Sequence, residues 1–451
     1  MKTAQLPTAA ALLTACTALR AQIKDAPDAN IAGIPVNYTE EKVGKITLPD
    51  VLKCFDGTPV TDSKTWFEKR RPELLKYFET EYYGRVPATA PKVFWEVVTT
   101  DKNALEGKAT LKTIAGHMGS KDGPAIGVTL YTPNDAKGPV PILTAITFNF
   151  GPARGPARGP AAPATGAAAS APGTPGAAST TAPAVARGPA GPARGTPAEI
   201  LSRGYAYATI NYTSIESDTS GRGDTANVNL ARKLGLAPGQ TAPNPDEWGT
   251  IAAWAWGISR WVDYLETDPT VDAKRVAITG TSRLGKTVTW AGANDPRIAL
   301  VIACCGGEGG AALARRNYGE TIAHLVEPTR YPYQFAGNYA QFAKDPNTSK
   351  VDTHCLVALM APRPILLSTA SADGWSDPYG EFCAAQAATP VFKLLGKGGI
   401  DDEKWPGTGD APSKSIPVGH ELSFTNVNGG HGSADWDTWL KFMDTYLKPA
   451  K

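Results

Sequence analysis

The sequence is poor in cysteine, in net charge and in metal-binding patterns. Its 451 residues include six cysteines, and those after Cys16 are odd in number and lack the spacing of metal ligands. Lysine and arginine number 45 against 43 acidic residues, which gives a net charge of +2. Such a balance argues against the broad basic surface of nucleic-acid-binding proteins. We therefore expect no nucleic-acid partner, no bound metal and no organic cofactor.

Long apolar runs are also missing beyond the N-terminus. No later stretch approaches the roughly 20 apolar residues that a membrane span requires. Residues 1–21 combine a short basic start, an apolar run and small residues, as a secretory signal does. Leu13-Thr-Ala-Cys16 also resembles a bacterial lipobox, so a lipid anchor on Cys16 is the alternative. We expect a secreted or periplasmic monomer in which residues 22–451 form one domain.

The apolar periodicity predicts an α/β protein. Residues 65–85 and 435–447 have apolar residues at helical spacing, and residues 92–132 alternate like antiparallel strands. Short apolar runs between helical patterns indicate buried parallel strands at 140–150, 205–212, 275–280, 299–304 and 364–369. The pattern predicts a three-layer sandwich around a central, mostly parallel sheet.

One region breaks this pattern. Residues 151–197 consist almost entirely of glycine, proline, alanine, arginine, serine and threonine, and Gly-Pro-Ala-Arg recurs. Such a segment cannot bury enough apolar surface to offset its ordering entropy. We interpret it as a disordered surface insertion, with an arginine-bearing arm that contacts acidic polysaccharide as the alternative.

The most informative motif is Arg275-Val-Ala-Ile-Thr-Gly-Thr-Ser-Arg-Leu-Gly-Lys286. It reads as a buried strand, a tight glycine turn that carries Ser282, and the start of a helix, which is the architecture of a nucleophile elbow. The following backbone N–H and the helix N-terminus can stabilise an oxyanion there. Ser282 is therefore the candidate nucleophile.

A serine nucleophile needs a base within hydrogen-bond reach. Of the five histidines, His431 lies in a late glycine-rich loop, Asn428-Gly-Gly-His-Gly, directly before the last helical pattern. This place follows the chain order serine, acid, histidine of α/β-hydrolases. His431 is the candidate base, and His420 is its main competitor.

At this point the residues support a resemblance. Gly280-Thr-Ser-Arg-Leu-Gly-Lys286 is similar to the nucleophile motif of glucuronoyl esterases, carbohydrate esterase family 15. Thr281 and Gly432 stand where many members have a cysteine pair, so the chain resembles the bacterial branch. Further similar blocks occur in the same order: Arg70-Arg-Pro-Glu, Tyr83-Gly-Arg-Val-Pro87, residues 309–316, Tyr318-Gly-Glu-Thr321, Ala361-Pro-Arg-Pro364, residues 375–382 and Gly429-Gly-His431.

The resemblance implies a catalytic domain of α/β-hydrolase fold that cleaves the ester between 4-O-methyl-glucuronate of glucuronoxylan and a lignin alcohol. Arg283 would help hold the oxyanion through its backbone N–H and its guanidinium. Lys286, one helical turn beyond Ser282, would bind sugar hydroxyls. Trp375 would pack on the sugar, against the alternative of a buried core tryptophan. Glu320 would accept a sugar hydroxyl, against the alternative of a salt bridge to Arg315 or Arg316.

The triad acid is where the chain departs from part of the family. Many members have a glutamate at the position that Cys305 occupies, and a neutral thiol cannot stabilise an imidazolium as a carboxylate does. Some members supply the acid from a later loop, where this chain has Asp373. Asp373 is the first choice, Glu308 is the alternative acid, and Asp377 is less favoured because Asp-Pro more often forms a turn.

Two other functions stay open on the sequence alone. A different carbohydrate esterase, such as an acetyl-xylan esterase, would share the triad and the fold. The Arg283 and Lys286 cations argue against it. A non-catalytic carbohydrate-binding protein on the same fold is the other alternative, because a fold does not fix a function.

Overall fold

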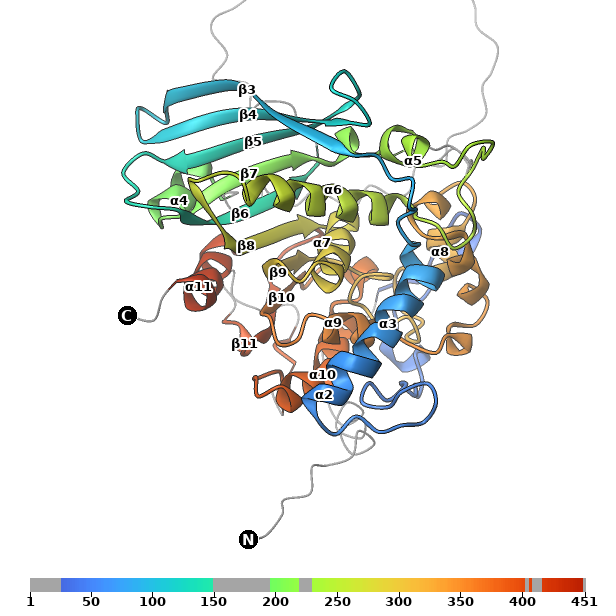
Figure 1. The fold of residues 1–451 in the computed structure, drawn as a ribbon. Helices are drawn as coiled ribbons and strands as arrows, with labels where there is room; N and C mark the ends of the chain where they lie inside the picture. Colours follow the sequence, from blue (N-terminus) through green and yellow to red (C-terminus); the bar gives the residue numbers. More distant parts are fainter. Residues whose placement is uncertain (1–25, 149–194, 219–228, 402–404, 408–415, 449–451) are drawn as a thin grey trace, which may run out of the picture.

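The computed structural model describes residues 26–148, 195–218, 229–401, 405–407 and 416–448. The predicted signal at 1–21, Cys16 and nearly all of the predicted insertion lie outside these residues. In the described part of the chain, a ten-stranded sheet runs through the molecule and helices cover both of its faces (Figure 1). A separate two-stranded ribbon pairs β1 (Ala29–Ile31) with β2 (Ile34–Val36).

The large sheet has the order β11-β12-β10-β9-β8-β6-β7-β5-β4-β3. The six neighbouring strands from β12 to β7 are parallel, and the strands at both ends are antiparallel. The strands are β3 Val93–Ala104, β4 Ala109–Met118, β5 Ala125–Pro133, β6 Val140–Thr147, β7 Ala206–Asn211, β8 Val271–Thr281, β9 Ile298–Cys304, β10 Ile365–Ala370, β11 Val418–Gly419 and β12 Leu422–Val427.

The five predicted parallel strands and the antiparallel run over 92–132 are confirmed. The pattern missed β12, whose six residues are all buried although Ser423, Thr425 and Asn426 interrupt its apolar side chains. The buried Thr425 hydroxyl has no hydrogen-bond partner among the described residues. The other two side chains are paired: Ser423 Oγ donates to the His420 carbonyl at 2.6 Å, and Asn426 Oδ1 accepts from Thr369 Oγ1 at 3.0 Å. Buried polar groups are tolerated when they are paired in this way.

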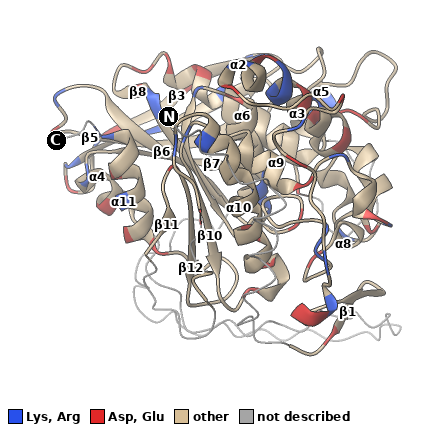
Figure 2. Ribbon diagram, turned by 90° about the horizontal axis from the view of Figure 1, so that it is seen from below, with Lys and Arg blue, Asp and Glu red and all other residues tan. Residues whose placement is uncertain are grey.

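Alternating side chains of the parallel strands bury two separate apolar layers. On β6, Ile142 and Ile146 face α6 and α7, whereas Leu143 and Ala145 face α4 and α11. Figure 2, viewed from below, shows α4 and α11 on one side of the strands and α6, α9 and α10 on the other. Burial of each large aliphatic side chain contributes roughly 1.5–3 kcal/mol. The predicted three-layer α/β sandwich is confirmed.

The helices that flank the sheet range from single turns to the 17 residues of α10. The α-helices are α2 Ser63–Thr65, α3 Arg71–Tyr77, α4 Pro197–Ser202, α5 Leu230–Leu234, α6 Thr250–Leu265, α7 Arg283–Asn294, α8 Ile322–Val326, α9 Thr353–Ala358, α10 Pro378–Leu394 and α11 Trp436–Leu447. Short 3-10 segments are η1 Glu40–Lys42, η4 Tyr212–Ser214, η5 Pro332–Gln334, η6 Gly337–Phe342, η7 Pro346–Thr348 and η8 Gly374–Ser376. The π-helical segment η2 Trp66–Arg70 joins α2 to α3, and a second one, η3 Phe78–Tyr83, continues α3. Together they form the helical stretch predicted at 65–85.

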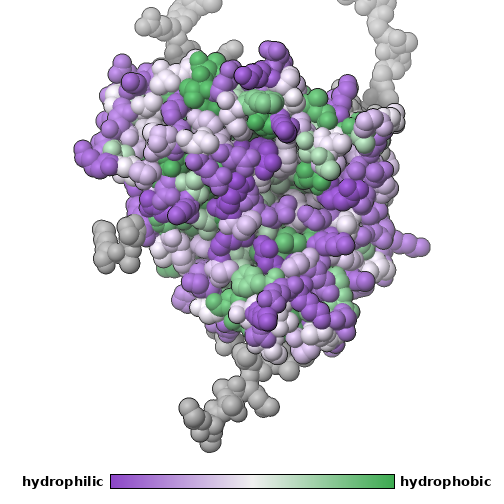
Figure 3. Space-filling view, in the orientation of Figure 1, coloured by the Kyte–Doolittle hydropathy of each residue, from purple (hydrophilic) through white to green (hydrophobic). Residues whose placement is uncertain are grey.

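The surface mixes apolar and charged side chains. Figure 3 shows small apolar groups separated by polar ones on the face that carries α6. Figure 2 shows basic and acidic residues interspersed along the described ribbon. Among the described helices, none is long and apolar enough to cross a membrane.

Candidate active site

Strand β8 ends in a tight turn that carries Ser282. Ser282 precedes α7 and has φ 62° and ψ −129°, a conformation that costs a non-glycine residue about 1–3 kcal/mol. Its backbone N–H donates to the Cys304 carbonyl on β9 at 2.9 Å, which ties the turn to the neighbouring strand. A strained turn between a strand and a helix presents its side chain at the carboxyl edge of the sheet. The structure therefore places the predicted nucleophile on an elbow.

Two glycines make this elbow sterically feasible. A β-carbon on Gly280 would lie 2.4 Å from the Leu284 carbonyl oxygen, and one on Gly285 would lie 2.6 Å from the Cys304 carbonyl oxygen. Backbone atoms cannot move away as a flexible side chain can. The glycine spacing around Ser282 is therefore required by close packing of the turn, of α7 and of β9.

The predicted base and the first-choice acid lie side by side. His431, in the loop after β12, has Nδ1 2.7 Å from Asp373 Oδ2, in the loop after β10. Ser376 Oγ lies 3.3 Å from the same nitrogen. Burial disfavours the charged imidazole, but the hydrogen bond and the charge of Asp373 outweigh burial and raise the pKa of His431. With Nδ1 facing the carboxylate, Nε2 is the ring nitrogen left to exchange a proton with a substrate.

The competing residues have other partners. Glu308 Oε1 accepts hydrogen bonds from Tyr339 Oη at 2.9 Å and from the Gly309 N–H at 3.0 Å. Asp377 is buried at the start of α10, where it caps the helix and pairs with Arg316 Nε at 2.8 Å. Both carboxyl groups thus have structural contacts away from the imidazole.

Cys305 and His420 have distinct surroundings. Cys305 is buried immediately after β9 in a left-handed conformation, with φ 47°. His420 is exposed in the turn between β11 and β12.

Arg283 is held by an acidic residue that the sequence reasoning did not identify. Its Nη1 lies 2.6 Å from Asp218 Oδ2, and its guanidinium stacks over the Tyr331 ring at 4.7 Å. Tyr333 Oη donates to the other oxygen of Asp218 at 2.5 Å. The Arg283 backbone N–H lies in the first turn of α7, where N–H groups have no acceptor within the helix. Arg283 therefore brings both a backbone donor and an anchored cation to the elbow.

Lys286 and Glu320 contact each other in the interior. Lys286 Nζ donates to the Glu308 carbonyl at 2.6 Å and to Glu320 Oε2 at 3.1 Å. The other Glu320 oxygen lies 3.3 Å from Arg330 Nη2. Glu320 thus lies between two cations. The alternative prediction, a salt bridge from Glu320 to Arg315 or Arg316, is wrong.

The structure gives those two arginines other acceptors. Arg316 pairs with Asp377 and Glu40, and Arg315 donates to the Ser349 carbonyl. These groups lie in loops, at helix ends or in the short 3-10 segment η1, where nearness in sequence does not decide which side chains meet.

One cavity of about 200 Å³ brings these groups together. Trp375 is half-buried at its wall, with Arg330 over its ring at 5.2 Å and His324 edge-on at 5.3 Å. Trp375 is therefore not a fully buried core residue. The lining residues are Ser282, Arg283, Lys286, Cys305, Glu320, Leu325, Arg330, Tyr331, Gln334, Trp375, Ser376 and His431.

Comparison with known proteins points to one family. A model of fungal glucuronyl esterases matches residues 243–396. Carbohydrate esterase MZ0003, from an unknown prokaryotic organism, is 38% identical over 433 residues, which are 93% of this chain and 95% of that protein. The solved glucuronoyl esterase from Solibacter usitatus is 38% identical with a TM-score of 0.73, over 91% of this chain and 100% of that chain. The chain belongs to the glucuronoyl esterase family.

This is carbohydrate esterase family 15, and the resemblance drawn from the elbow motif is thereby confirmed. The α/β-hydrolase fold and the serine esterase class are confirmed with it. A further relative, 4-O-methyl-glucuronoyl methylesterase 1 from Phanerochaete chrysosporium, is 34% identical over 188 residues, 40% of this chain and 38% of that protein.

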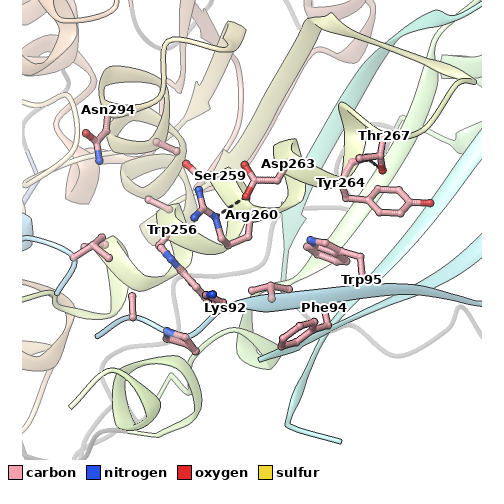
Figure 4. A pocket seen from close by; sticks show the side chains of 17 residues that line it. Lys92, Phe94, Trp95, Trp256, Ser259, Arg260, Asp263, Tyr264, Thr267 and Asn294 are labelled. Atoms are coloured by element: carbon pink, nitrogen blue, oxygen red, sulfur yellow. Dashed lines mark hydrogen bonds and ion pairs between the residues drawn. The ribbon is translucent and has the colours of Figure 1, made fainter. Parts of the chain in front are cut away.

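A second cavity, of about 730 Å³, lies between the start of β3, α6 and the end of α7 (Figure 4). Arg260 and Asp263 form an ion pair at its wall, with Arg260 Nε 3.0 Å from Asp263 Oδ2. Trp95 packs 5.6 Å from Tyr264 across it. None of the predicted site residues is among the described residues that line this cavity. The smaller cavity, and not the larger one, is the candidate esterase site.

The sequence reasoning missed several cavity residues. These include Arg330, Tyr331, Gln334 and Ser376, and the reasoning also missed Asp218, which contacts Arg283 but is not among the described lining residues. Gln334 and Ser376 end the short 3-10 segments η5 and η8, and the other three lie outside helices and strands. The block at 375–382, quoted for its resemblance, contains Ser376 and was the available signal for that residue. The others carry no local pattern that separates them from surface side chains.

Proposed function

We propose that this chain hydrolyses the ester between 4-O-methyl-glucuronate of glucuronoxylan and a lignin alcohol. The observation that carries the proposal is the single cavity that contains Ser282 on its elbow, His431 and three cations, Arg283, Lys286 and Arg330. The family supplies the reaction class, since relatives are named glucuronoyl esterases and 4-O-methyl-glucuronoyl methylesterases. A cavity rich in cations suits a uronic acyl group, whose oxygens carry negative charge during and after the reaction.

In this mechanism Ser282 Oγ attacks the ester carbonyl carbon while His431 Nε2 accepts the serine proton. The imidazolium then donates that proton to the departing alcohol, which leaves an acyl group on Ser282. Asp373 holds the ring through Nδ1 and stabilises its positive charge. A water molecule repeats the cycle on the acyl-enzyme and releases the uronate. Throughout, the Arg283 backbone N–H supplies an oxyanion donor.

Three other lining residues of the cavity, Lys286, Glu320 and Trp375, would bind the substrate. Lys286 is only 4% exposed and its carboxylate partner Glu320 only 8%, so both heads are fixed before a substrate enters. Fixed donors and acceptors suit sugar hydroxyls because little ordering entropy remains to be lost. Trp375 offers its ring to the apolar face of a pyranose.

The same proposal covers where the protein works. We infer export to the periplasm or the medium, as the signal-like N-terminus predicts, and action as a monomer. Polymeric glucuronoxylan is reached only outside the cytoplasm, so the inferred location agrees with the substrate.

The test compares three esters with the wild-type protein: benzyl glucuronate, acetylated xylan and 4-nitrophenyl acetate. We expect the highest kcat/KM on benzyl glucuronate. Turnover confined to acetyl esters would instead support an acetyl-xylan esterase. Tight uronate binding without turnover of any ester would support a non-catalytic carbohydrate-binding protein.

A further inference from the structure

Three potential metal ligands meet at the carboxyl edge of the sheet. Cys305 Sγ, a carboxylate oxygen of Asp373 and a ring nitrogen of His431 all lie within 4.8 Å of one another. Each residue follows a different one of three adjacent parallel strands: β9, β10 and β12. The sheet itself therefore sets the spacing of the three groups.

We propose that Cys305, Asp373 and His431 form an inhibitory binding site for a thiophilic divalent metal ion such as Zn²⁺. Zinc is bound in proteins by thiolate, imidazole and carboxylate, and sites with three protein ligands leave a fourth position open. Here the open position would face the cavity that Cys305 and His431 share with Ser282. Hard cations such as Mg²⁺ and Ca²⁺ prefer sets of oxygen ligands, so the site should discriminate against them.

The charges of the three ligands match the ion. A thiolate and a carboxylate supply two negative charges and neutral imidazole supplies none, so bound Zn²⁺ makes the cluster neutral. Coordination to a divalent cation deprotonates a thiol. Binding thus releases the thiol proton to solvent.

Metal binding would block the proposed catalytic cycle through the histidine. Nδ1 of His431 faces Asp373 at 2.7 Å, and in the active form it carries the proton that Asp373 accepts. When the lone pair of Nδ1 binds a metal ion, the imidazole proton must reside on Nε2. A protonated Nε2 cannot accept the proton of Ser282. This inhibitory consequence rests on the proposed function, whereas metal binding by the cluster does not.

The ion has a route to the cluster. The His431 side chain is 41% exposed, whereas that of Asp373 is 3% exposed and Cys305 is 1% exposed as a whole. The ion therefore reaches the imidazole first and recruits the two buried ligands behind it. Substrate and metal share this entrance, so substrate should protect against inhibition.

The activity test measures inhibition of wild type and of Cys305→Ser, each relative to its own metal-free rate. We expect Zn²⁺ and Cd²⁺ to inhibit wild type, chelator to restore the rate, and Mg²⁺ and Ca²⁺ to have no effect. Cys305→Ser should need at least tenfold more Zn²⁺, because one ligand is weakened. Cys54→Ser is the matched control, since Cys54 is also buried but neighbours Lys69 and Glu73, and it should behave as wild type. Equal sensitivity of Cys305→Ser and wild type would overturn the proposal.

A binding test does not need turnover. Ser282→Ala titrated with Cd²⁺ should show thiolate-to-metal charge-transfer absorption that saturates at one ion per chain. The absorption should vanish in Ser282→Ala/Cys305→Ala, with folding checked by circular dichroism. Absorption that survives the loss of Cys305 would overturn the site. Saturable absorption in a protein whose wild type cleaves no glucuronate ester would keep the site and discard the proposed function.

Discussion

His431 Nδ1 and Asp373 Oδ2 lie 2.7 Å apart, although 57 residues separate the two residues in the chain. They meet because β10 and β12 are adjacent parallel strands whose following loops lie at the same edge of the sheet. The hydrogen bond fixes which ring nitrogen faces the cavity. The loop after β10 therefore supplies the carboxylate that contacts His431.

The first prediction compares the two candidate acids. Asp373→Asn should lower kcat on benzyl glucuronate on the order of 10⁴-fold, since an amide removes the charge and favours the wrong tautomer of His431. Glu308→Gln should change kcat by less than about threefold, because Gln can keep the contacts to Tyr339 and Gly309. Steady-state kinetics of both variants measures the two kcat values to be compared. The reverse ranking would move the acid to the loop after β9.

The second prediction concerns the anchor of Arg283. Asp218→Asn keeps a hydrogen-bond acceptor beside Arg283 Nη1 but removes its charge partner, so the guanidinium should lose its fixed position. A charge-assisted hydrogen bond contributes about 1.5–3 kcal/mol, so kcat should fall roughly 10- to 100-fold. In Arg283→Ala the same substitution at Asp218 should add little, because the two residues act as one unit. Additive losses in this double-mutant cycle would show that Asp218 does not act through Arg283.

The third prediction separates substrate binding from chemistry. Lys286→Met keeps an unbranched side chain in the interior but removes the cation between Glu320 and the Glu308 carbonyl. KM for benzyl glucuronate should rise about tenfold or more, while kcat/KM for 4-nitrophenyl acetate should stay within about threefold. A parallel loss on both esters would mean that Lys286 supports the elbow and not the sugar.

The fourth prediction links pH to stability. Burial raises the pKa of the Glu381 carboxyl from its ordinary value of 4.5 to about 8. Between these values the unfolded chain loses this proton and the folded chain keeps it, so the free energy of unfolding should fall as pH rises from about 5 to 8. Urea denaturation of Glu381→Gln across this range should show a smaller decline than wild type.

Glu68→Gln, at an exposed position of the helical stretch Ser63–Tyr83, is the control for this pH series. It should follow the wild-type slope. A Glu381→Gln slope equal to that of wild type would show that Glu381 keeps the same proton affinity in both states.

The sequence was most informative where the chemistry is local. The elbow could be predicted because Gly280, Ser282 and Gly285 lie within six residues, and close backbone contacts leave no room for a β-carbon on either glycine. The parallel strands were predicted for a similar reason, since burial on both faces leaves a continuous apolar run. Strand β12 was missed because polar side chains interrupt its buried run.

The triad acid and the sugar-binding wall could not be settled from sequence. Asp373 was one of three carboxyl groups at plausible places, and their side-chain partners distinguish them: Asp373 contacts His431, whereas Asp377 pairs with Arg316 and Glu308 with Tyr339. Glu320 reaches Lys286, 34 residues earlier, and not the arginines that are its neighbours in the chain. Asp218 gave no signal, because its role depends on a guanidinium 65 residues later. Contacts between loops depend on the order of the strands in the sheet, and one amino-acid sequence does not reveal that order.

The central claim is that Ser282 is the nucleophile of a uronate esterase, and one measurement tests it most directly. Benzyl glucuronate hydrolysis is followed for wild type, Ser282→Ala and Ser376→Ala, a serine in the same cavity. We expect wild type to hydrolyse the ester, the rate to fall at least about 10³-fold in Ser282→Ala, and the rate to fall much less in Ser376→Ala. Glucuronate turnover that persists in Ser282→Ala would contradict the account.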